Sequence, residues 1–438
     1  MRIAVYTLGC KVNQYETQAI EQELLRRGHA LVGFEEEADA YIVNTCSVTA
    51  VSDKKSRQML RRAKARNPSA VIAACGCYAQ THADEVAALG VDVLAGTNDR
   101  MGFLDLVERS AQSRDGAQGG ENAPIVRVDD ALRRRAFEAL PAGGLSARTR
   151  AMLKIEDGCA NFCAYCIIPF ARGPVRSLPA DEASLQVKNM VYKGYREVIL
   201  TGIEISSYGQ DFSEQVTLID LVERLCREAP GLRFRLGSLE PRTVTREFCE
   251  RAARLPNLCP HFHLSLQSGC DATLRRMNRR YDAARYAASC ALLREYFDDP
   301  AITADLITGF PRETEAEFAE TLAFIEKCAF ADMHVFPYSI RPGTKAAGME
   351  QVEKAVREER AARAAECARR MKADYLARCV GKTFPVLFEG AEAGGSSGHA
   401  PNYAEVYVEE KGLQNELRAV RIVSSGGGRL LGELEGRP

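Results

Sequence analysis

The chain has 438 residues, more than one compact core usually holds, so two or three domains are expected. Its net charge of −1 excludes a uniformly basic nucleic-acid coat, and any RNA contact must come from local basic patches. With 46% hydrophobic and 27% charged residues and no apolar run of membrane-spanning length, the composition predicts a soluble globular protein without a membrane partner.

The cysteine content and the first residues indicate the compartment. The N-terminal apolar run meets Gly9 too soon for a signal peptide, so we expect a cytoplasmic protein. In that compartment 15 cysteines favour metal or redox use over disulfides.

Strand and helix signals alternate up to about Val107, which predicts a parallel α/β sheet. The expected strands are Ile3–Tyr6, Ala40–Asn44, Ala70–Ala74 and Val91–Ala95, and the expected helices are Tyr15–Arg27, Asp53–Arg66 and His82–Leu89. Cys10, Cys46 and Cys77 each follow one of these strands. Because ligands gather at the carboxyl ends of parallel strands, these three thiols can converge, with Cys75 competing with Cys77 for the third place.

A polar segment follows this sheet. From Ser110 to about Ser146, Gly, Gln, Asn, Ser, Asp and Arg dominate, which predicts an exposed linker. The run Arg133–Arg135 is more typical of a solvated helix end than of a nucleic-acid site.

The alternation resumes from Ala151 to about Ser339, and six strand–helix units predict an open, partial TIM-like barrel. The expected strands are Ala151–Glu156, Glu197–Thr201, Phe234–Ser238, His261–Leu266, Ile302–Ile307 and His334–Tyr338. Expected helices between them include Leu185–Lys193, Leu218–Arg227, Ala283–Phe297 and Glu315–Cys328. Barrel chemistry sits at the carboxyl ends of such strands.

The first barrel strand leads into Cys159, Cys163 and Cys166, spaced C-x3-C-x2-C. A closed zinc site or a fully ligated iron–sulfur cluster takes four ligands, so three thiolates favour a cluster with one open iron. Two alternatives stay open: a zinc site completed by His261 or His263, and a redox pair formed by Cys163 and Cys166 at a helix start.

The C-terminal part has two sections. Met349 to about Ala377 lacks Gly and Pro and predicts a long helix, and the tail from Gly381 predicts a small antiparallel β-barrel. Its expected strands are Phe384–Phe388, Tyr403–Val408, Ala419–Ile422 and Leu430–Leu434, separated by turns such as Gly394–Gly398. Cysteines expected to be plain buried residues of helices are Cys226, Cys249, Cys290, Cys328, Cys367 and Cys379.

A collinear series of motifs resembles the radical S-adenosylmethionine methylthiotransferases. The segments are Thr7–Asn13, Asn44–Val48, Gly76–Gln80, Asp157–Pro169, Arg172–Ser177, Leu200–Ile203, Ser238–Pro241, His263–Cys270, Met277–Arg280 and Asp305–Pro311. The tail resembles the RNA-binding TRAM domain through Asn402 and Tyr403 and its Gly-punctuated strands. The implied domains are 1–112 with an auxiliary cluster, a linker at 113–146, a radical domain at 147–378 and a TRAM domain at 379–438.

The resemblance implies two 4Fe–4S clusters and S-adenosylmethionine as cofactors. Cys159, Cys163 and Cys166 would hold the radical-generating cluster, and Cys10, Cys46 and Cys77 the sulfur-carrying one. Tyr165 would pack against the adenine of S-adenosylmethionine. Its remaining contacts are expected among Gly202, Glu204, Ser238, Glu240, Ser265 and Gln267, although polar groups at strand ends also serve loop backbone.

Within this family, Thr7–Asn13 and Asp332–Tyr338 look most like the branch acting on N6-threonylcarbamoyladenosine. The implied reaction adds a methylthio group at C2 of that nucleoside in the tRNA anticodon loop, with a reductant such as flavodoxin or ferredoxin. Alternatives are the same chemistry on isopentenyl-adenosine or on an Asp of a ribosomal protein, and a non-enzymatic iron–sulfur RNA-binding or electron-transfer protein. Arg312 and Gly237 depart from the family pattern, where Gly and Ser are common.

Phosphate contacts to tRNA require Arg and Lys side chains. One group of candidates lies near the first domain: Lys54, Lys55, Arg57, Arg61 and Arg62. The favoured group lies near the barrel: Arg275, Arg276, Arg279 and Arg280.

Overall fold

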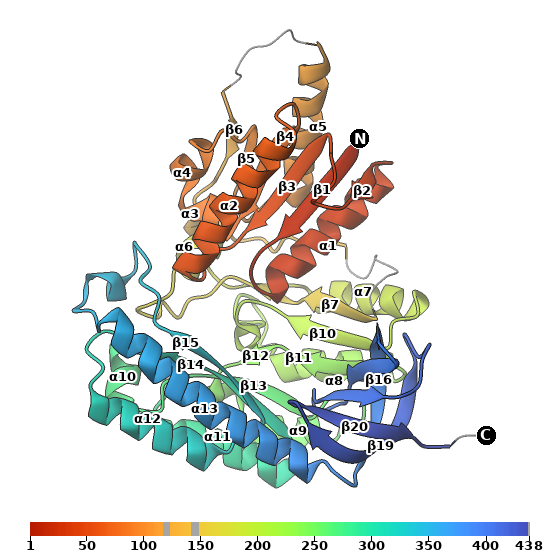
Figure 1. The fold of residues 1–438 in the computed structure, drawn as a ribbon, viewed down its shortest axis with the longest axis vertical. Coiled ribbons are helices and arrows are strands. Elements are labelled where there is room, and N and C mark those ends of the chain that lie inside the picture. The colour runs from red at the N-terminus through yellow and green to blue at the C-terminus, as the bar shows by residue number, and fades with distance from the viewer. Residues whose placement is uncertain (117–122, 142–148, 437–438) are drawn as a thin grey trace.

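The computed structural model describes residues 1–116, 123–141 and 149–436. Figure 1 shows an N-terminal sheet domain above a larger barrel-like domain, with a small C-terminal β-barrel beside the latter. No helix of the described residues is long and apolar enough to cross a membrane.

The N-terminal sheet is parallel throughout, in the order β2-β1-β3-β4-β5-β6. Its strands are β1 (Arg2–Thr7), β2 (Ala30–Val32), β3 (Ala40–Thr45), β4 (Val71–Gly76), β5 (Val93–Ala95) and β6 (Ile125–Arg127). Its helices are α1 (Lys11–Arg26), α2 (Ala50–Arg66), α3 (Cys77–Thr81), α4 (Ala83–Ala87) and α5 (Arg100–Gly116). Every residue of β3 and β4 is buried, as expected for central strands covered on both faces.

The expected linker is largely exposed at residues 123–141, where the structure describes it, but it contains short elements of secondary structure. Helix α5 continues to Gly116, and β6 adds an edge strand beside β5. A 3-10 helix, η1 (Ala131–Arg133), follows, and Arg134 is buried in ion pairing with Asp129 and hydrogen bonding to Thr97. The three side chains of β6 are exposed, so its sequence carried no burial signal. The expected linker residues 117–122 and 142–146 lie outside the described residues.

The central domain is the partial barrel predicted from the sequence. Its strands run parallel and in chain order as two adjoining sheets, β7-β10-β11 and β12-β13-β14-β15. They are β7 (Arg150–Lys154), β10 (Glu197–Thr201), β11 (Arg233–Leu236), β12 (Ser238–Leu239), β13 (His261–Gln267), β14 (Ala301–Thr308) and β15 (Asp332–Pro337). Gly237 separates β11 from β12, and a Cβ there would lie 2.9 Å from the Leu200 carbonyl oxygen. A side chain at this position would therefore require the neighbouring backbone at Leu200 to shift.

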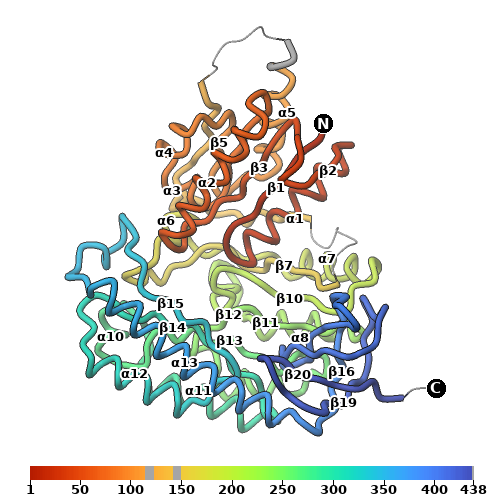
Figure 2. Tube along the Cα trace, viewed as in Figure 1, coloured from red at the N-terminus to blue at the C-terminus, as the bar shows by residue number. Residues whose placement is uncertain are grey.

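Helices cover the outside of these strands (Figures 1 and 2). They are α7 (Ala180–Tyr192), α8 (Leu218–Glu228), α9 (Arg246–Ala253), α10 (Asp271–Arg276), α11 (Ala283–Tyr296), α12 (Glu315–Cys328) and α13 (Lys354–Arg378). Short 3-10 turns are η2 (Ile205–Ser207), η3 (Pro241–Thr243) and η4 (Lys345–Gly348). The six cysteines assigned to helical regions are all buried, five of them inside these helices and Cys379 just after α13.

The tail forms a closed barrel in the order β16-β17-β18-β20-β19, antiparallel except for the β18–β20 pair. Its strands are β16 (Thr383–Glu392), β17 (Gly395–His399), β18 (Glu405–Val408), β19 (Leu417–Gly426) and β20 (Arg429–Leu434). The expected turn at Gly394–Gly398 is wrong, because most of it belongs to β17. A Cβ at Gly395 would lie 2.0 Å from the Val408 carbonyl oxygen, so a small residue lets the neighbouring backbone approach.

A buried ion group joins this small barrel to the central domain. Glu197 of β10 accepts a hydrogen bond from Arg235 of β11 at 2.9 Å and also pairs with Arg233. Arg235 then donates to the Pro401 carbonyl oxygen at 2.8 Å, and Arg233 to that of Pro385 at 2.8 Å.

Candidate active site

Three loops of the N-terminal sheet bring Cys10, Cys46 and Cys77 together. Cys10 precedes α1, Cys46 follows β3, and Cys77 begins α3 directly after β4. Burial raises the pKa of Cys77 to about 12; the positive charge of Arg172 opposes this rise, and the neighbouring thiols of Cys46 and Cys10 add to it. The predicted convergence of these three thiols is therefore present in the structure. Mutually close thiols fit a thiophilic metal group that replaces their protons.

Glycines allow this close approach. Gly9 and Gly76 have φ of +105° and +97°, in the region that favours glycine. A Cβ at Gly9 would lie 2.9 Å from Cys46 Sγ, and one at Gly76 would lie 2.4 Å from the Thr45 carbonyl oxygen.

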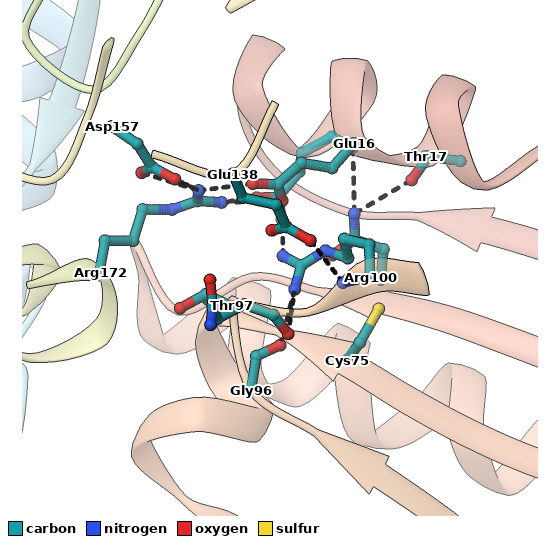
Figure 3. Close-up of polar contacts among 12 residues, drawn as sticks. Glu16, Thr17, Cys75, Gly96, Thr97, Arg100, Glu138, Asp157 and Arg172 are labelled. Carbon is teal, nitrogen blue, oxygen red and sulfur yellow. Dashed lines mark hydrogen bonds and ion pairs between the residues drawn. The ribbon is translucent and has the colours of Figure 1, made fainter. Parts of the chain in front are cut away.

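Cys75 takes a different environment. It lies inside β4 in the buried cluster that includes Ile42 and Val93, on the side of Arg100 (Figure 3). Burial raises its pKa to about 12, and the charges of Arg100, Glu16, Glu138 and Arg172 act on it. The geometry therefore favours Cys77 as the partner of Cys10 and Cys46.

The second triad lies on the loop between β8 (Glu156–Asp157) and α6 (Ile168–Arg172). Burial raises the pKa values of Cys159 and Cys166, and the charge of Cys163 raises both further. The loop is fixed by backbone hydrogen bonds: Ala164 donates to the Met277 carbonyl oxygen at 2.9 Å.

The two alternative readings of this triad fit the structure less well. Helix α6 begins at Ile168, two residues beyond Cys166, so the Cys163–Cys166 pair does not open a helix. His261 packs against the ring of Tyr403 with centroids 4.9 Å apart, and His263 lies 3.2 Å from Asp305. In the described part of the chain, no three Cys, His, Asp or Glu side chains converge on one single-ion position. A cluster instead bonds each thiolate to a different iron.

The expected contacts of S-adenosylmethionine come from the carboxyl ends of neighbouring strands. Glu204 caps η2, and burial raises its pKa. Ser238 and Ser265 share a hydrogen bond of 2.9 Å, and Glu240 accepts two hydrogen bonds from Arg242. These residues thus lie at the carboxyl ends of neighbouring barrel strands. Ser238 and Ser265 are hydrogen-bonded to each other, and Glu240 is hydrogen-bonded to Arg242. Gln267 ends β13 with a φ of +64°, after a bulge.

A small cavity touches these strand ends and the second triad. It is lined by Cys163, Glu240, Arg279 and their neighbours and is too narrow to hold a water molecule as it stands. Tyr165 lies beside Phe310 in an edge-to-face contact with centroids 6.4 Å apart.

Glu156 was missed by the sequence reasoning. Its Oε2 accepts a hydrogen bond from the Glu204 backbone at 2.7 Å, and a Cβ at Gly202 would lie 2.7 Å from that oxygen. Its Oε1 is buried without a hydrogen-bond partner among the described residues. Burial raises the pKa of Glu156 well above its usual range. Such a group fits a donor from a bound molecule.

A buried ionic network lies close to both triads, and Figure 3 shows its members Glu16, Arg100, Arg172 and Asp157. Glu16 of α1 lies 2.7 Å from Arg172 of α6 and 2.8 Å from Arg100 of α5. Arg172 also lies 3.1 Å from Asp157, which is two residues before Cys159, and its charge acts on Cys77. Burial opposes ionisation of Glu16, but Arg100, Arg172 and Lys154 outweigh it and hold its pKa well below the usual range. These partners are far apart in sequence, so no spacing could have indicated the network.

A second bridge between the two domains lies close in sequence to Cys46. Arg341, after β15, pairs with Asp53 of α2 at 2.7 Å and donates to Ser47 Oγ at 2.7 Å. The Ala50 backbone donates to Ser339 Oγ at 2.9 Å. The chain around Cys46 is thereby attached to the central domain.

Some of the basic side chains expected to contact RNA are already engaged with other side chains of the protein. Arg276 pairs with Glu317 at 2.7 Å, and Arg279 donates a hydrogen bond to Cys163. Arg57 donates to Tyr78 Oη at 2.7 Å and Arg62 pairs with Glu35 at 2.6 Å. The other candidates, Lys54, Lys55, Arg61, Arg275 and Arg280, are exposed and have no such pairing with any residue that the structure describes.

Two exposed aromatic side chains flank the second triad and were not singled out by sequence. Phe162 is 46% exposed and Phe170 is 44% exposed, with ring centroids 5.8 Å apart in an edge-to-face contact. Phe162 adopts a φ of +45°, a strained conformation for a non-glycine residue within the ligand loop.

Comparisons with known proteins match both halves of this site. Residues 2–96 match a family described as "Uncharacterized protein family UPF0004", and residues 153–325 match the Radical SAM superfamily. A Bacillus subtilis protein named threonylcarbamoyladenosine tRNA methylthiotransferase MtaB is 38% identical, covering 97% of this chain and 94% of its own. A Thermotoga maritima protein of the same name is 35% identical, and the match covers 96% of this chain and 94% of that protein.

Two further comparisons concern a relative with a different tRNA substrate in its name and a solved structure of similar fold. A tRNA-2-methylthio-N(6)-dimethylallyladenosine synthase of Symbiobacterium thermophilum is 31% identical, covering 100% of this chain and 95% of its own. Among solved structures, the radical S-adenosylmethionine methyltransferase TsrM of Kitasatospora setae aligns with a TM-score of 0.55, covering 90% of this chain and 79% of that chain. At 13% identity this likeness shows the fold alone.

Proposed function

Because the chain belongs to the radical S-adenosylmethionine methylthiotransferase family, we propose that it adds a methylthio group at C2 of N6-threonylcarbamoyladenosine in the tRNA anticodon loop. The relatives at 38% and 35% identity carry that activity in their names. The observation that carries the proposal is the pair of cysteine triads, each with mutually close thiols, joined by one ionic network.

The family implies two 4Fe–4S clusters and S-adenosylmethionine. Cys159, Cys163 and Cys166 would hold one cluster, and Cys10, Cys46 and Cys77 the other. When bound, these groups supply the radical and the sulfur, chemistry that protein side chains cannot provide for an aromatic C–H bond.

The residues of the chain position these groups and exclude water. Glu204 would accept the amino group of S-adenosylmethionine, aided by Glu156, whose buried oxygen lacks a protein donor among the described residues. Gly202 leaves room beside Glu156, and Tyr165 would pack on the adenine. Further contacts are proposed from Ser238, Glu240, Ser265 and Gln267. The network of Glu16 and Arg172 fixes the separation of the triads.

The tRNA contact draws on the exposed cations and aromatic rings near the second triad. Arg275 and Arg280 can neutralise phosphates, and Phe162 and Phe170 offer stacking surfaces for unpaired bases. The electron needed for radical formation is proposed to come from a reductant of the flavodoxin or ferredoxin class.

The test uses the full chain, reconstituted without oxygen from iron and sulfide and supplied with S-adenosylmethionine and dithionite. Anticodon stem-loops carrying either threonylcarbamoyladenosine or isopentenyl-adenosine serve as substrates, with nucleosides analysed by mass spectrometry. We expect the methylthio product only from the first stem-loop, and no 5′-deoxyadenosine from Cys163→Ala. Product from the isopentenyl stem-loop alone would overturn the substrate, and 5′-deoxyadenosine from Cys163→Ala would overturn the cluster assignment.

A further inference from the structure

A cluster of titratable side chains that belongs to neither cysteine triad lies on the barrel strands. His263 of β13 lies 3.2 Å from Asp305 of β14 through Nε2, and its Nδ1 lies 3.0 Å from Thr303 Oγ1. His334 of β15 is the register partner of Asp305, and its ring centroid is 6.4 Å from that of His263. Three neighbouring strands therefore contribute side chains to one polar cluster.

This polar cluster shares a strand face with expected contacts of S-adenosylmethionine. Along β13, the buried side chains of Phe262 and Leu264 belong to the hydrophobic core, whereas His263 and Ser265 alternate with them. Ser265 is hydrogen-bonded to Ser238, which is the residue of β12 that pairs with His263 in the sheet. His263 and Asp305 thus lie on the face on which the reaction is proposed to occur.

Lys11 approaches the same cluster from the N-terminal domain. It directly follows Cys10 and begins α1, and its Nζ lies 5.9 Å from the ring centroid of Tyr403. Burial disfavours ionisation of Asp305, but the hydrogen bond from His263 and the charges of His334 and Lys11 outweigh burial and lower its pKa. Lys11 forms no ion pair with any residue that the structure describes, so its charge is available to a ligand.

The proposed substrate has a chemical feature that matches this arrangement. A threonylcarbamoyl group carries a carboxylate, a hydroxyl and ureido N–H groups, whereas an isopentenyl group is hydrocarbon. A carboxylate needs a cation or strong donors, while a hydroxyl and N–H groups need acceptors. Lys11 and His334 offer donors to the carboxylate. Asp305, oriented by His263, offers an acceptor to the hydroxyl and N–H groups.

We propose that Lys11 and His334 bind the carboxylate of the threonylcarbamoyl side chain, and that the His263–Asp305 pair binds its hydroxyl or ureido groups. This inference rests on the proposed function and assigns its substrate selectivity to four side chains. It places the side chain of the target nucleoside between Cys10 and the strands β13 to β15. An isopentenyl group would cover Lys11, His334 and Asp305 without offering them a polar partner, which disfavours it.

The experiment measures binding of two anticodon stem-loops to the reconstituted full chain by fluorescence anisotropy. One carries threonylcarbamoyladenosine, and the other carries its carboxamide, which is neutral and nearly the same size. Lys11→Gln should weaken binding of the acid roughly 10- to 100-fold and leave binding of the carboxamide unchanged. Lys11→Arg should retain most of the affinity, and Lys193→Gln, an exposed lysine after α7, serves as the matched control.

Lys11 adjoins Cys10, so the iron content of each variant is measured as well. If Lys11→Gln loses iron, His334→Gln carries the test, because His334 is remote in sequence from every proposed ligand and should show the same selective loss. Equal weakening on both stem-loops would overturn the inference, since it would indicate a phosphate contact. If the parent chain modifies only isopentenyl-adenosine, the proposed function fails; if it modifies threonylcarbamoyladenosine but binds acid and carboxamide equally, only this inference fails.

Discussion

The guanidinium of Arg279 donates a hydrogen bond from Nη1 to Sγ of Cys163 across 3.2 Å. The same group lies over the ring of Tyr281, 4.8 Å from its centroid, which fixes its orientation. A permanent positive charge is thus held at the middle cysteine of the second triad. Hydrogen bonds to cluster sulfurs stabilise the reduced cluster, which carries more negative charge.

Replacing Arg279 with Met should lower the reduction potential of the cluster at this triad. The expected change is on the order of tens of millivolts, the scale of one charge-assisted hydrogen bond. A redox titration followed by electron paramagnetic resonance measures it in the reconstituted protein. The matched control is Arg280→Met, which removes an exposed neighbouring charge. An unchanged potential in Arg279→Met would show that this hydrogen bond is absent when the cluster is bound.

Glu16→Gln should destabilise the protein strongly. It removes the shared negative charge from Arg100 and Arg172, leaving buried guanidinium groups poorly compensated. Breaking a buried ion pair from one side costs about 3–5 kcal/mol, and we expect that loss in the free energy of unfolding from urea denaturation. Glu358→Gln, which removes an exposed ion pair with Lys354, should change it by less than about 1 kcal/mol. Similar values for the two variants would contradict the role given to the network.

Glu197 should contribute stability that disappears in acid. Burial disfavours its ionisation, but Arg235 and Arg233 outweigh burial and lower its pKa to about 2, against 4.5 for the free side chain. Because the folded pKa is depressed, the contribution is complete above about pH 4.5 and is lost as the pH falls towards 2. The shift corresponds to at most about 3 kcal/mol.

The measurement compares the free energy of unfolding of the parent chain and Glu197→Gln at several pH values. The difference between them should be largest at neutral pH and shrink below pH 4.5 or so. A difference that stays constant down to about pH 3 would show that the carboxylate charge is not what stabilises this junction.

Cys77→Ala and Cys75→Ala should differ in bound iron. Cys77 lies with Cys10 and Cys46, so its loss should remove about half of the iron, namely the cluster of this first triad. Cys75 lies in the buried interior of the sheet, and its replacement should leave the iron content unchanged. Iron and sulfide analysis with absorption spectra checks both variants. Iron loss in Cys75→Ala alone would reverse the assignment of the third ligand.

Elements with strong local signals could be predicted from the sequence to the residue. Helix α12 begins and ends as expected because Thr314 and Glu317 form a capping box ahead of an apolar pattern. Strand β10 is a short, fully buried run with a clear boundary. Strands β6 and β17 were missed, because β6 exposes all its side chains and β17 is rich in Gly and Ser. Their strand conformation is imposed by neighbouring strands rather than by their own residues.

In the candidate site, too, some features follow from local sequence and others depend on how distant segments pack. The convergence of Cys10, Cys46 and Cys77 could be expected because each follows a parallel strand, and a parallel sheet aligns those ends. The partners of Glu16 could not, because Arg100 and Arg172 come from distant segments whose contact depends on how the two domains pack. The expected domain bounds and the individual contacts of S-adenosylmethionine stay predictions.

The ionic network also limits how this chain can recombine with its relatives. Glu16 belongs to the first domain, while Arg172 and Asp157 belong to the second. A chimaera that takes its N-terminal sheet from one relative and its barrel from another would bury these charges against foreign partners. Only exchanges that carry Glu16, Arg100, Arg172 and Asp157 as a set would preserve the junction, so the two halves are expected to be inherited as one unit.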